Sequence, residues 1–195
     1  MLLENAFAET FGAVGASGPV QEWKERVVVA RFVARVAALG PLSPASPALQ
    51  ARLLDEVKFV ARHIDGSAET GAVAGYDRRV LHEEGDTWSL AAIILRPGQQ
   101  TPEHDHGGWG CAVTVQGVER DRRFAEDAAG ALQALGARDY PPGTGYVFDA
   151  TDVHQPVGAD PHRVTVALHF LVHHSRINHL HETRDYAEAF YAEVA

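Results

Sequence analysis

The chain has 195 residues, of which 46% are apolar, so it can bury a sizeable core and wholesale disorder is excluded. Its net charge of −9 argues against a nucleic-acid-binding protein, and no apolar run reaches the roughly 20 residues that span a bilayer. The N-terminus shows no secretory signal, and the single cysteine, Cys111, excludes an intramolecular disulfide, so we expect a cytoplasmic protein.

The first 70 residues predict a layer of helices. Apolar residues recur at helical spacing over 21–39 and again over 48–63, and Gly40-Pro41 separates the two segments. The residues that form these stripes are Trp23, Val27, Ala30 and Ala34 in the first helix, and Leu49, Leu53, Leu54, Val57 and Val60 in the second.

From residue 76 onward the pattern changes to short β-rich runs separated by turns, which is typical of a barrel or sandwich. We predict strands over 88–95, 111–116, 145–149 and 163–172. We expect a C-terminal tail over 176–195 that ends in a helix, with Tyr186, Phe190 and Tyr191 as docking residues. No repeat or linker is visible, so 1–195 is predicted to be a single domain.

The segment Pro102-Glu103-His104-Asp105-His106 contains a histidine pair. Residues two apart in an extended segment point to the same side, so His104 and His106 can present two imidazoles to one metal ion. His154, which lies just after the predicted strand 145–149, is the best candidate for a third ligand. We therefore predict a metal site on His104, His106 and His154.

The predicted strand 163–172 has one wholly apolar face, and His169 lies on the other face among small residues. This placement suits a barrel interior, with a satisfied core histidine as the alternative. Strict alternation from His106 would place Cys111 on the opposite face, but the pair Gly107-Gly108 can host a bulge that resets the parity. We expect Cys111 to face inward, with a small buried core residue as the alternative.

The arrangement resembles the two-motif signature of the cupin barrel. The resemblance implies a mainly β fold, with a cupin-type jelly roll over 76–175 and a small N-terminal helical layer over 1–70. Cys111 stands where the first motif has a glutamate ligand, so three neutral imidazoles remain. The residues that fit the two motifs are His104, His106 and Gly117 in the first, and Gly143 and His154 in the second.

Within the cupins, the stretch from Tyr76 to His169 is similar to the cysteine dioxygenase family of thiol dioxygenases. The matching features are Tyr76-Asp77-Arg78, His104-Asp105-His106, Trp109-Gly110, Cys111, His154 and His169. This resemblance implies a monomer that holds Fe(II) on the three histidines and oxidises a small carboxylate-bearing thiol with O2 to the sulfinate.

The same resemblance implies roles for four other residues. Arg78 would grip the substrate carboxylate through its planar fork, with a solvated arginine of a polar surface turn as the alternative. Tyr76 would offer a hydroxyl to the substrate as a catalytic and binding residue, with a packing role as the alternative. Cys111 would lie beside the substrate, and His169 would act near the metal as a catalytic residue. No nucleic-acid or membrane partner is expected.

One motif departs from the family. The family's Ser-x-His-x-Tyr corresponds here to Ala167, His169 and Leu171, so the serine and the tyrosine are absent and Cys111 lacks its cross-linking partner. The sequence does not decide whether the substrate is cysteine or a mercapto acid such as 3-mercaptopropionate. Two alternatives stay open: a three-histidine hydrolase or isomerase that uses zinc or another metal, and a cupin that binds a small molecule without catalysis.

Overall fold

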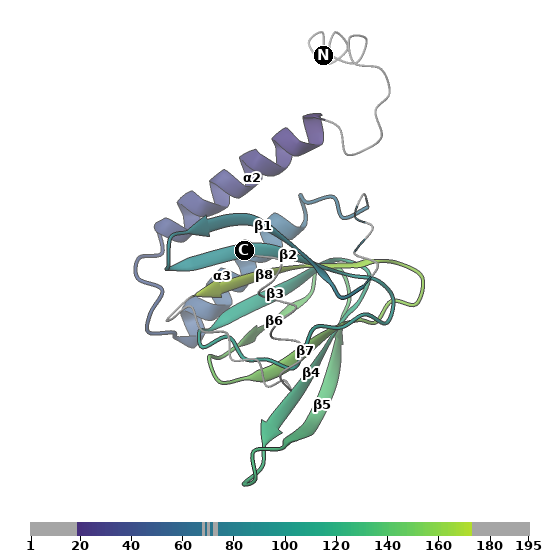
Figure 1. Cartoon of the computed structure of the whole chain (residues 1–195). Helices are drawn as coiled ribbons and strands as arrows, with labels where there is room; N and C mark the ends of the chain where they lie inside the picture. The colour runs from purple at the N-terminus through teal and green to yellow at the C-terminus, as the bar shows by residue number, and fades with distance from the viewer. Residues whose placement is uncertain (1–18, 68, 70, 72–73, 173–195) are drawn as a thin grey trace, which may run out of the picture.

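In a computed structural model, residues 19–67, 69, 71 and 74–172 are described, and they form two helices followed by eight strands (Figure 1). One antiparallel sheet has the order β1-β2-β8-β3-β6, and the other has the order β5-β4-β7. The elements are α2 (Pro19–Ala37), α3 (Pro47–Ala61), β1 (Asp77–Glu84), β2 (Trp88–Leu95), β3 (Gly110–Gln116), β4 (Glu119–Glu126), β5 (Leu132–Tyr140), β6 (Gly145–Phe148), β7 (Val153–Gly158) and β8 (Thr165–Val172).

The segment 100–104 completes the second sheet, because it pairs with β7 through two antiparallel bridges. Gln100 pairs with Val157, and His104 pairs with His154. Four strands of the first sheet then run β2-β8-β3-β6, and the second runs from segment 100–104 through β7 and β4 to β5. This is the strand order of a jelly roll, which confirms the predicted mainly β architecture with N-terminal helices.

The predicted helices and strands are found within one or two residues of their expected bounds. The helix α3 begins at a Ser46 cap, whose hydroxyl accepts a hydrogen bond from the Leu49 amide at 3.2 Å, with Pro47 as the first helical residue. Between β3 and β4 the chain turns at Gly117, where φ is +71° and an added Cβ would lie 2.8 Å from Thr165. Only glycine fits that turn.

The helices cover one face of the five-stranded sheet, which we call the outer face (Figure 1). There Phe32 of α2 packs edge-on against Trp88 and Phe170, with ring centroids 5.9 Å away in both pairs. The predicted stripe on α2 is wrong, because Trp23 is 63% exposed and Val27 is 46% exposed. The buried stripe of α2 consists of Val29, Phe32 and Val36.

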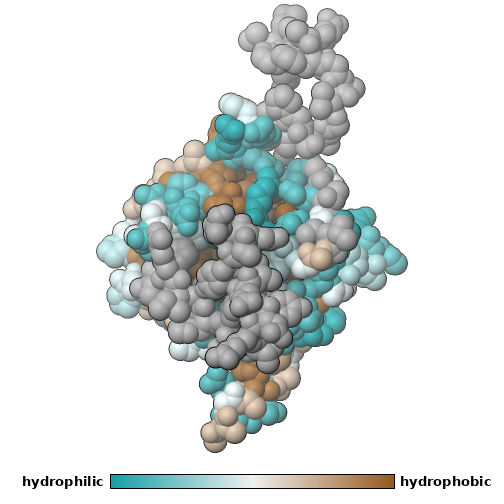
Figure 2. Space-filling model, viewed as in Figure 1, coloured by the Kyte–Doolittle hydropathy of each residue, from teal (hydrophilic) through white to brown (hydrophobic). Residues whose placement is uncertain are grey.

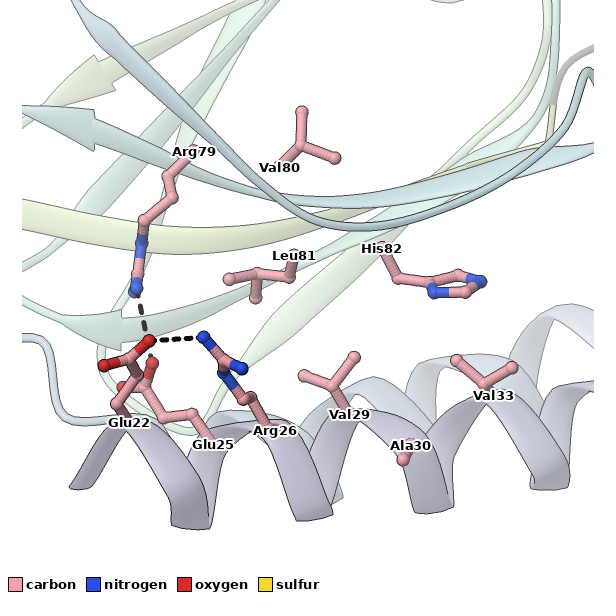
Figure 3. Close-up of a pocket in the computed structure, with 10 residues that line it drawn as sticks. All are labelled: Glu22, Glu25, Arg26, Val29, Ala30, Val33, Arg79, Val80, Leu81 and His82. Atoms are coloured by element: carbon pink, nitrogen blue, oxygen red, sulfur yellow. Dashed lines mark hydrogen bonds and ion pairs between the residues drawn. The ribbon is translucent and has the colours of Figure 1, made fainter. Parts of the chain in front are cut away.

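A cleft of about 510 Å³ lies between α2 and β1 (Figure 3). Arg79 spans it and forms ion pairs with Glu25 at 3.3 Å and Glu69 at 3.1 Å. Figure 2 shows apolar surface beside α2, next to hydrophilic residues. Arg79 therefore ties the edge strand β1 to the helical layer.

Neither described helix combines the length and the apolar character that crossing a bilayer requires. The predicted tail over 176–195, with Tyr186, Phe190 and Tyr191, lies outside the described residues.

Candidate metal centre

Three histidine side chains converge between the two sheets. The possible ligand atoms of His104, His106 and His154 all lie within 4.8 Å of one another. The Nε2 atoms of His106 and His154 are 3.0 Å apart. Reciprocal backbone hydrogen bonds of 3.0 and 2.9 Å join His104 to His154, so the pairing of the strands brings these distant ligands together. The predicted grouping of the three histidines is therefore found.

Two of the three rings are oriented by hydrogen bonds at the nitrogen that faces away from the group. Nδ1 of His104 donates to the Pro102 carbonyl at 2.8 Å, and Nδ1 of His154 donates to the Asp121 carboxylate at 2.8 Å. Because a carbonyl or a carboxylate only accepts, both rings carry their proton on Nδ1. Their Nε2 atoms are left with a lone pair for a metal ion.

A chain of ion pairs continues outward from His154. Asp121, which is 2% exposed, is held by Arg123, and Arg123 in turn donates to Asp152 at 2.6 Å. Burial raises the pKa of Asp121, while the Arg123 guanidinium opposes that shift. Arg123 thus supports Asp121 as the acceptor that fixes the tautomer of His154.

Burial also acts on the histidines themselves. It lowers the pKa of His104, and it lowers the pKa of His154 well below its usual value, an effect to which the neighbouring His104 adds. Both imidazoles are therefore neutral near pH 7, which is the form that coordinates metal ions.

The group fits one divalent ion. Two nitrogen ligands, each about 2.1 Å from an ion and at right angles, would lie roughly 3.0 Å apart. The Nε2 atoms of His106 and His154 have that separation. The set contains three imidazoles and no carboxylate among the described residues, a donor set that suits iron and zinc alike.

The opposite, inner face of the five-stranded sheet looks toward the second sheet and carries His169. In the antiparallel ladder His169 pairs with Ala91 on β2 and with Ala112 on β3. Its Nε2 donates to Glu119 on β4 at 3.0 Å, across the gap between the sheets. The interior placement of His169 is as expected. The residue that orients it is Glu119, since the serine and the tyrosine of the family motif are absent at Ala167 and Leu171.

Aromatic residues of β6 surround the histidine group. Phe148 packs 4.8 Å from the His106 ring and 5.2 Å from the His154 ring, measured between centroids. The ring of Tyr146 lies 6.3 Å from His154. Burial raises the pKa of Tyr146 well above its usual value, and Glu119 and Asp121 add to the shift, so its hydroxyl stays protonated.

Cys111 is not placed with the histidines. It is fully buried on the outer face, in the same cluster as Leu53 and Val57 of α3. Its ladder partner is Phe170, whereas the neighbouring Ala112 pairs with His169, so the expected bulge does not turn Cys111 inward. Burial raises the pKa of its thiol, which keeps it protonated and unreactive.

Arg78 and Tyr76 lie at the edge of the first sheet. Arg78 pairs with Ile93, which pairs with Ala167 on β8. Directly opposed residues project from the same face, so Arg78 shares the inner face with His169, while Arg79 is on the outer face. Arg78 is exposed, and Tyr76 is half-buried directly before β1.

Sequence reasoning missed four polar residues around the centre, because each becomes part of it only through cross-strand pairing. Three of them lie at alternate positions of the strongly charged strand β4, so they project from one face of it. This alternation is the sequence signal that could have identified them. The missed residues are Glu119, Asp121, Arg123 and Tyr146.

No protein-family profile matches the chain. An uncharacterised double-stranded β-helix protein from Klebsiella pneumoniae is similar at 16% identity and a TM-score of 0.43, over 58% of this chain and 90% of that one. Oxalate oxidase in complex with glycolate is similar at 12% identity and a TM-score of 0.46, over 58% and 59% of the two chains. An RmlC-like cupin from Desulfovibrio desulfuricans is similar at 16% identity and a TM-score of 0.38, over 55% and 92%.

Proposed function

We propose that this protein is an Fe(II)-dependent thiol dioxygenase that converts a small carboxylate-bearing thiol and O2 into the sulfinate. The observation that carries the proposal is the convergence of His104, His106 and His154 as neutral ligands, two of which have their Nε2 atoms free. The resemblance of the sequence from Tyr76 to His169 to the cysteine dioxygenase family supports the same activity.

The reaction adds both atoms of O2 to sulfur, so that RSH and O2 give RSO2H without a further reductant. An Fe(II) ion on the three histidines would supply the redox chemistry and would favour the thiolate form of the substrate. Because the ligands are uncharged, the ion would keep its full positive charge for an anionic sulfur.

Arg78 is the candidate for binding the substrate carboxylate. It lies on the inner face, as His169 does, and its guanidinium can donate two parallel hydrogen bonds to a carboxylate. By contrast, Arg79 is engaged with Glu25 and Glu69 on the other face. Of the two adjacent arginines, Arg78 is therefore the candidate for the carboxylate.

His169 is the candidate for contacting the bound substrate. Its Nε2–H is held by Glu119, which fixes the plane of the ring and leaves Nδ1 as the ring's second hydrogen-bonding atom. Its side chain is 10% exposed, so little bulk water reaches it. A ring nitrogen fixed in a dry interior can orient a polar group of the substrate through a hydrogen bond.

The direct test combines metal content with oxygen uptake. Protein purified anaerobically with Fe(II) should hold about one iron per chain, as expected for a single three-ligand site. It should consume O2 with cysteine, 3-mercaptopropionate or mercaptosuccinate and form one sulfinate per O2. His104→Ala should lose the iron and the uptake, whereas the exposed His162→Ala should keep both. Unchanged iron in His104→Ala would exclude this site.

A binding protein without turnover is the second candidate, and one observation favours it. Ala167 and Leu171 stand on either side of His169 where the family has a serine and a tyrosine, and Leu171 packs in an apolar cluster with Phe148. Thermal stabilisation by thiols without oxygen uptake would support this candidate. Native zinc with hydrolase activity would support the other alternative.

A further inference from the structure

The hydroxyl of Tyr146 lies among buried charged groups of the opposite sheet. Tyr146 is on β6 and is 6% exposed, and its ring belongs to an apolar cluster with Phe148 and Leu171. The hydroxyl, by contrast, interacts with two carboxylates of β4, those of Glu119 and Asp121. The activity proposed above gives this hydroxyl no role.

Each of the two carboxylates orients a histidine. Asp121 accepts a hydrogen bond from Nδ1 of His154 at 2.8 Å, and Glu119 accepts one from Nε2 of His169 at 3.0 Å. The two acids are two residues apart on β4, so they project from the same face of that strand. The Tyr146 hydroxyl therefore lies beside the partners of both a candidate metal ligand and the candidate for contacting the substrate.

The free acceptor decides which carboxylate the hydroxyl serves. A phenol carries one proton, so it donates to one acceptor at a time. Both oxygens of Asp121 are already used, because Oδ1 accepts from His154 and Oδ2 accepts from Arg123. Glu119 uses only Oε2, and its buried Oε1 has no other hydrogen-bond partner among the described residues. The Tyr146 hydroxyl therefore donates to Oε1 of Glu119.

Arg123 keeps the phenol in this position. Its guanidinium carbon lies over the ring of Tyr146, 5.4 Å from the centroid. A cation over the face of an aromatic ring is attracted to that face. Arg123 thus occupies the second oxygen of Asp121 and also holds the ring that carries the hydroxyl.

The strand that carries His169 offers no second way to orient this side chain. Ala167 and Leu171, two positions away on either side, share its face and have no polar side-chain atoms. The His169 ring is held from the facing sheet by Glu119. The terminal torsion of a glutamate is broad, so a carboxylate fixed by one hydrogen bond can still turn. A second hydrogen bond at Oε1 removes that freedom.

We propose that Tyr146 is a positioning residue for the reaction, because its hydroxyl fixes Glu119 and thereby holds His169 in the orientation that serves the substrate. Tyr146 itself would touch neither the substrate nor the metal ion. This inference rests on the proposed function for the role of His169. The hydrogen-bonded chain from Tyr146 through Glu119 to His169 can nevertheless be tested without turnover.

The first test records the His169 ring in the absence of any reaction. In zinc-loaded protein with isotope-labelled histidine, NMR measures how fast the ring proton on Nε2 exchanges with water. Tyr146→Phe removes only the hydroxyl and leaves Glu119 free to turn, so this exchange should become about tenfold faster, as expected for the loss of one hydrogen bond. The Nδ1 proton of His154 should keep its rate, because both oxygens of Asp121 are occupied without Tyr146.

The second test is kinetic and uses the iron-loaded protein. In Tyr146→Phe, kcat for oxygen uptake should fall about tenfold through the loss of orientation. KM should stay nearly unchanged, because the metal ion and Arg78 would still hold the thiol. Tyr140→Phe is the matched control, since its ring lies 4.6 Å from that of Tyr146, measured between centroids. Removal of the Tyr140 hydroxyl should change neither the proton exchange nor kcat.

An unchanged exchange of the His169 proton in Tyr146→Phe would overturn the inference. Equal acceleration at His154, or equal effects in Tyr140→Phe, would also overturn it, because either result would indicate a general loosening of the packing. A higher KM with unchanged kcat would overturn it as well.

The failure of the proposed function can be distinguished from the failure of this inference. A wild type without oxygen uptake would exclude the dioxygenase, whereas faster exchange at His169 in Tyr146→Phe would still support the positioning. Should Tyr146→Phe fail to fold, 3-fluorotyrosine in place of all five tyrosines makes the phenol a stronger donor and keeps the ring. Slower exchange of the His169 proton would then support the inference, and an unchanged rate would overturn it.

Discussion

The two faces of the five-stranded sheet carry opposite chemistry on the same strands. On the outer face Cys111, Leu168 and Phe170 pack with the helices in a continuous apolar cluster. On the inner face, one residue away along each strand, Ala112 and His169 look toward the histidine group. A shift of one residue therefore separates the part that stabilises the protein from the part that we expect to react.

Phe170→Ala should have the largest effect on stability. Phe170 is fully buried and stacks on Trp88 with centroids 5.1 Å apart, so its removal should lower the free energy of unfolding by about 3–5 kcal/mol. His169→Ala should cost less, about 1–3 kcal/mol for the partner lost by Glu119, but it should abolish turnover. Urea denaturation and oxygen uptake measure the two effects. A larger loss of stability in His169→Ala than in Phe170→Ala would contradict the division of roles between the two faces.

Asp121→Asn should lower the affinity for the metal ion without unfolding the protein. The carboxylate that accepts from His154 Nδ1 would be replaced by an amide, and loss of such a partner lowers metal affinity about 10–100-fold. Competition with a chelator measures the change. Asp139→Asn is the matched control, because Asp139 pairs with Arg120 at the exposed edge; equal losses in the two variants would contradict the role of Asp121.

The metal-free protein should lose stability as the pH falls below about 6.5, the usual pKa of a histidine in an unfolded chain. Burial lowers the pKa of His104 and His154, so below that pH the unfolded chain binds protons that the folded chain does not. The expected slope is up to about 1.4 kcal/mol per pH unit for each histidine, and it should level off at higher pH. Urea titrations from pH 5.5 to 7.5 check the sign, and a stability that increases on acidification would contradict it.

The adjacent arginines offer a smaller and more selective contrast. Arg78→Ala should weaken binding of carboxylate-bearing thiols about tenfold and leave stability nearly unchanged, because Arg78 is exposed. Arg79→Ala should leave binding unchanged and lower stability by about 1 kcal/mol or less, because its two ion pairs are partly exposed. Parallel calorimetry and denaturation distinguish the two, and equal effects on binding would refute the assignment of faces.

Cys111→Ala should have the smallest effect. The thiol lies on the outer face, so oxygen uptake should not change, and stability should fall by about 1 kcal/mol. In the folded wild type the buried thiol should resist alkylation by iodoacetamide, as followed by mass spectrometry. Rapid alkylation at a native pH, or a loss of turnover in the variant, would show that Cys111 belongs to the site.

The apolar strands could be predicted from the sequence, whereas the charged ones could not. The strands β2 and β8 are wholly or almost wholly buried and have runs of apolar residues that mark them clearly. The sequence of β4, Glu-Arg-Asp-Arg-Arg-Phe-Ala-Glu, is polar on both faces because its inner residues form a buried charged network. A search for alternating apolar residues therefore does not identify β4 as a strand.

The three histidines of the candidate metal site could be predicted, but the residues that hydrogen-bond to them could not. His104 and His106 are two residues apart, and His154 follows a recognisable turn and strand. By contrast, Asp121 lies 33 residues from His154, and Glu119 lies 50 residues from His169. Only the register of the strands defines those pairs. The prediction that Cys111 faces inward was wrong, because the pairing of β3 with β8 decides which residues of β3 lie on the inner face.

The reciprocal backbone hydrogen bonds between His104 and His154 have a consequence for assembly. They join two of the three segments that carry the histidines through the main chain alone. No ion is therefore needed to bring together these two segments, which are 50 residues apart in the sequence. Apoprotein leaving the ribosome can accordingly finish folding before it meets its ion, and extraction by a chelator should be reversible. We therefore expect metal loading to be a late, exchangeable step, in which the ion that is bound depends on the supply in the surroundings.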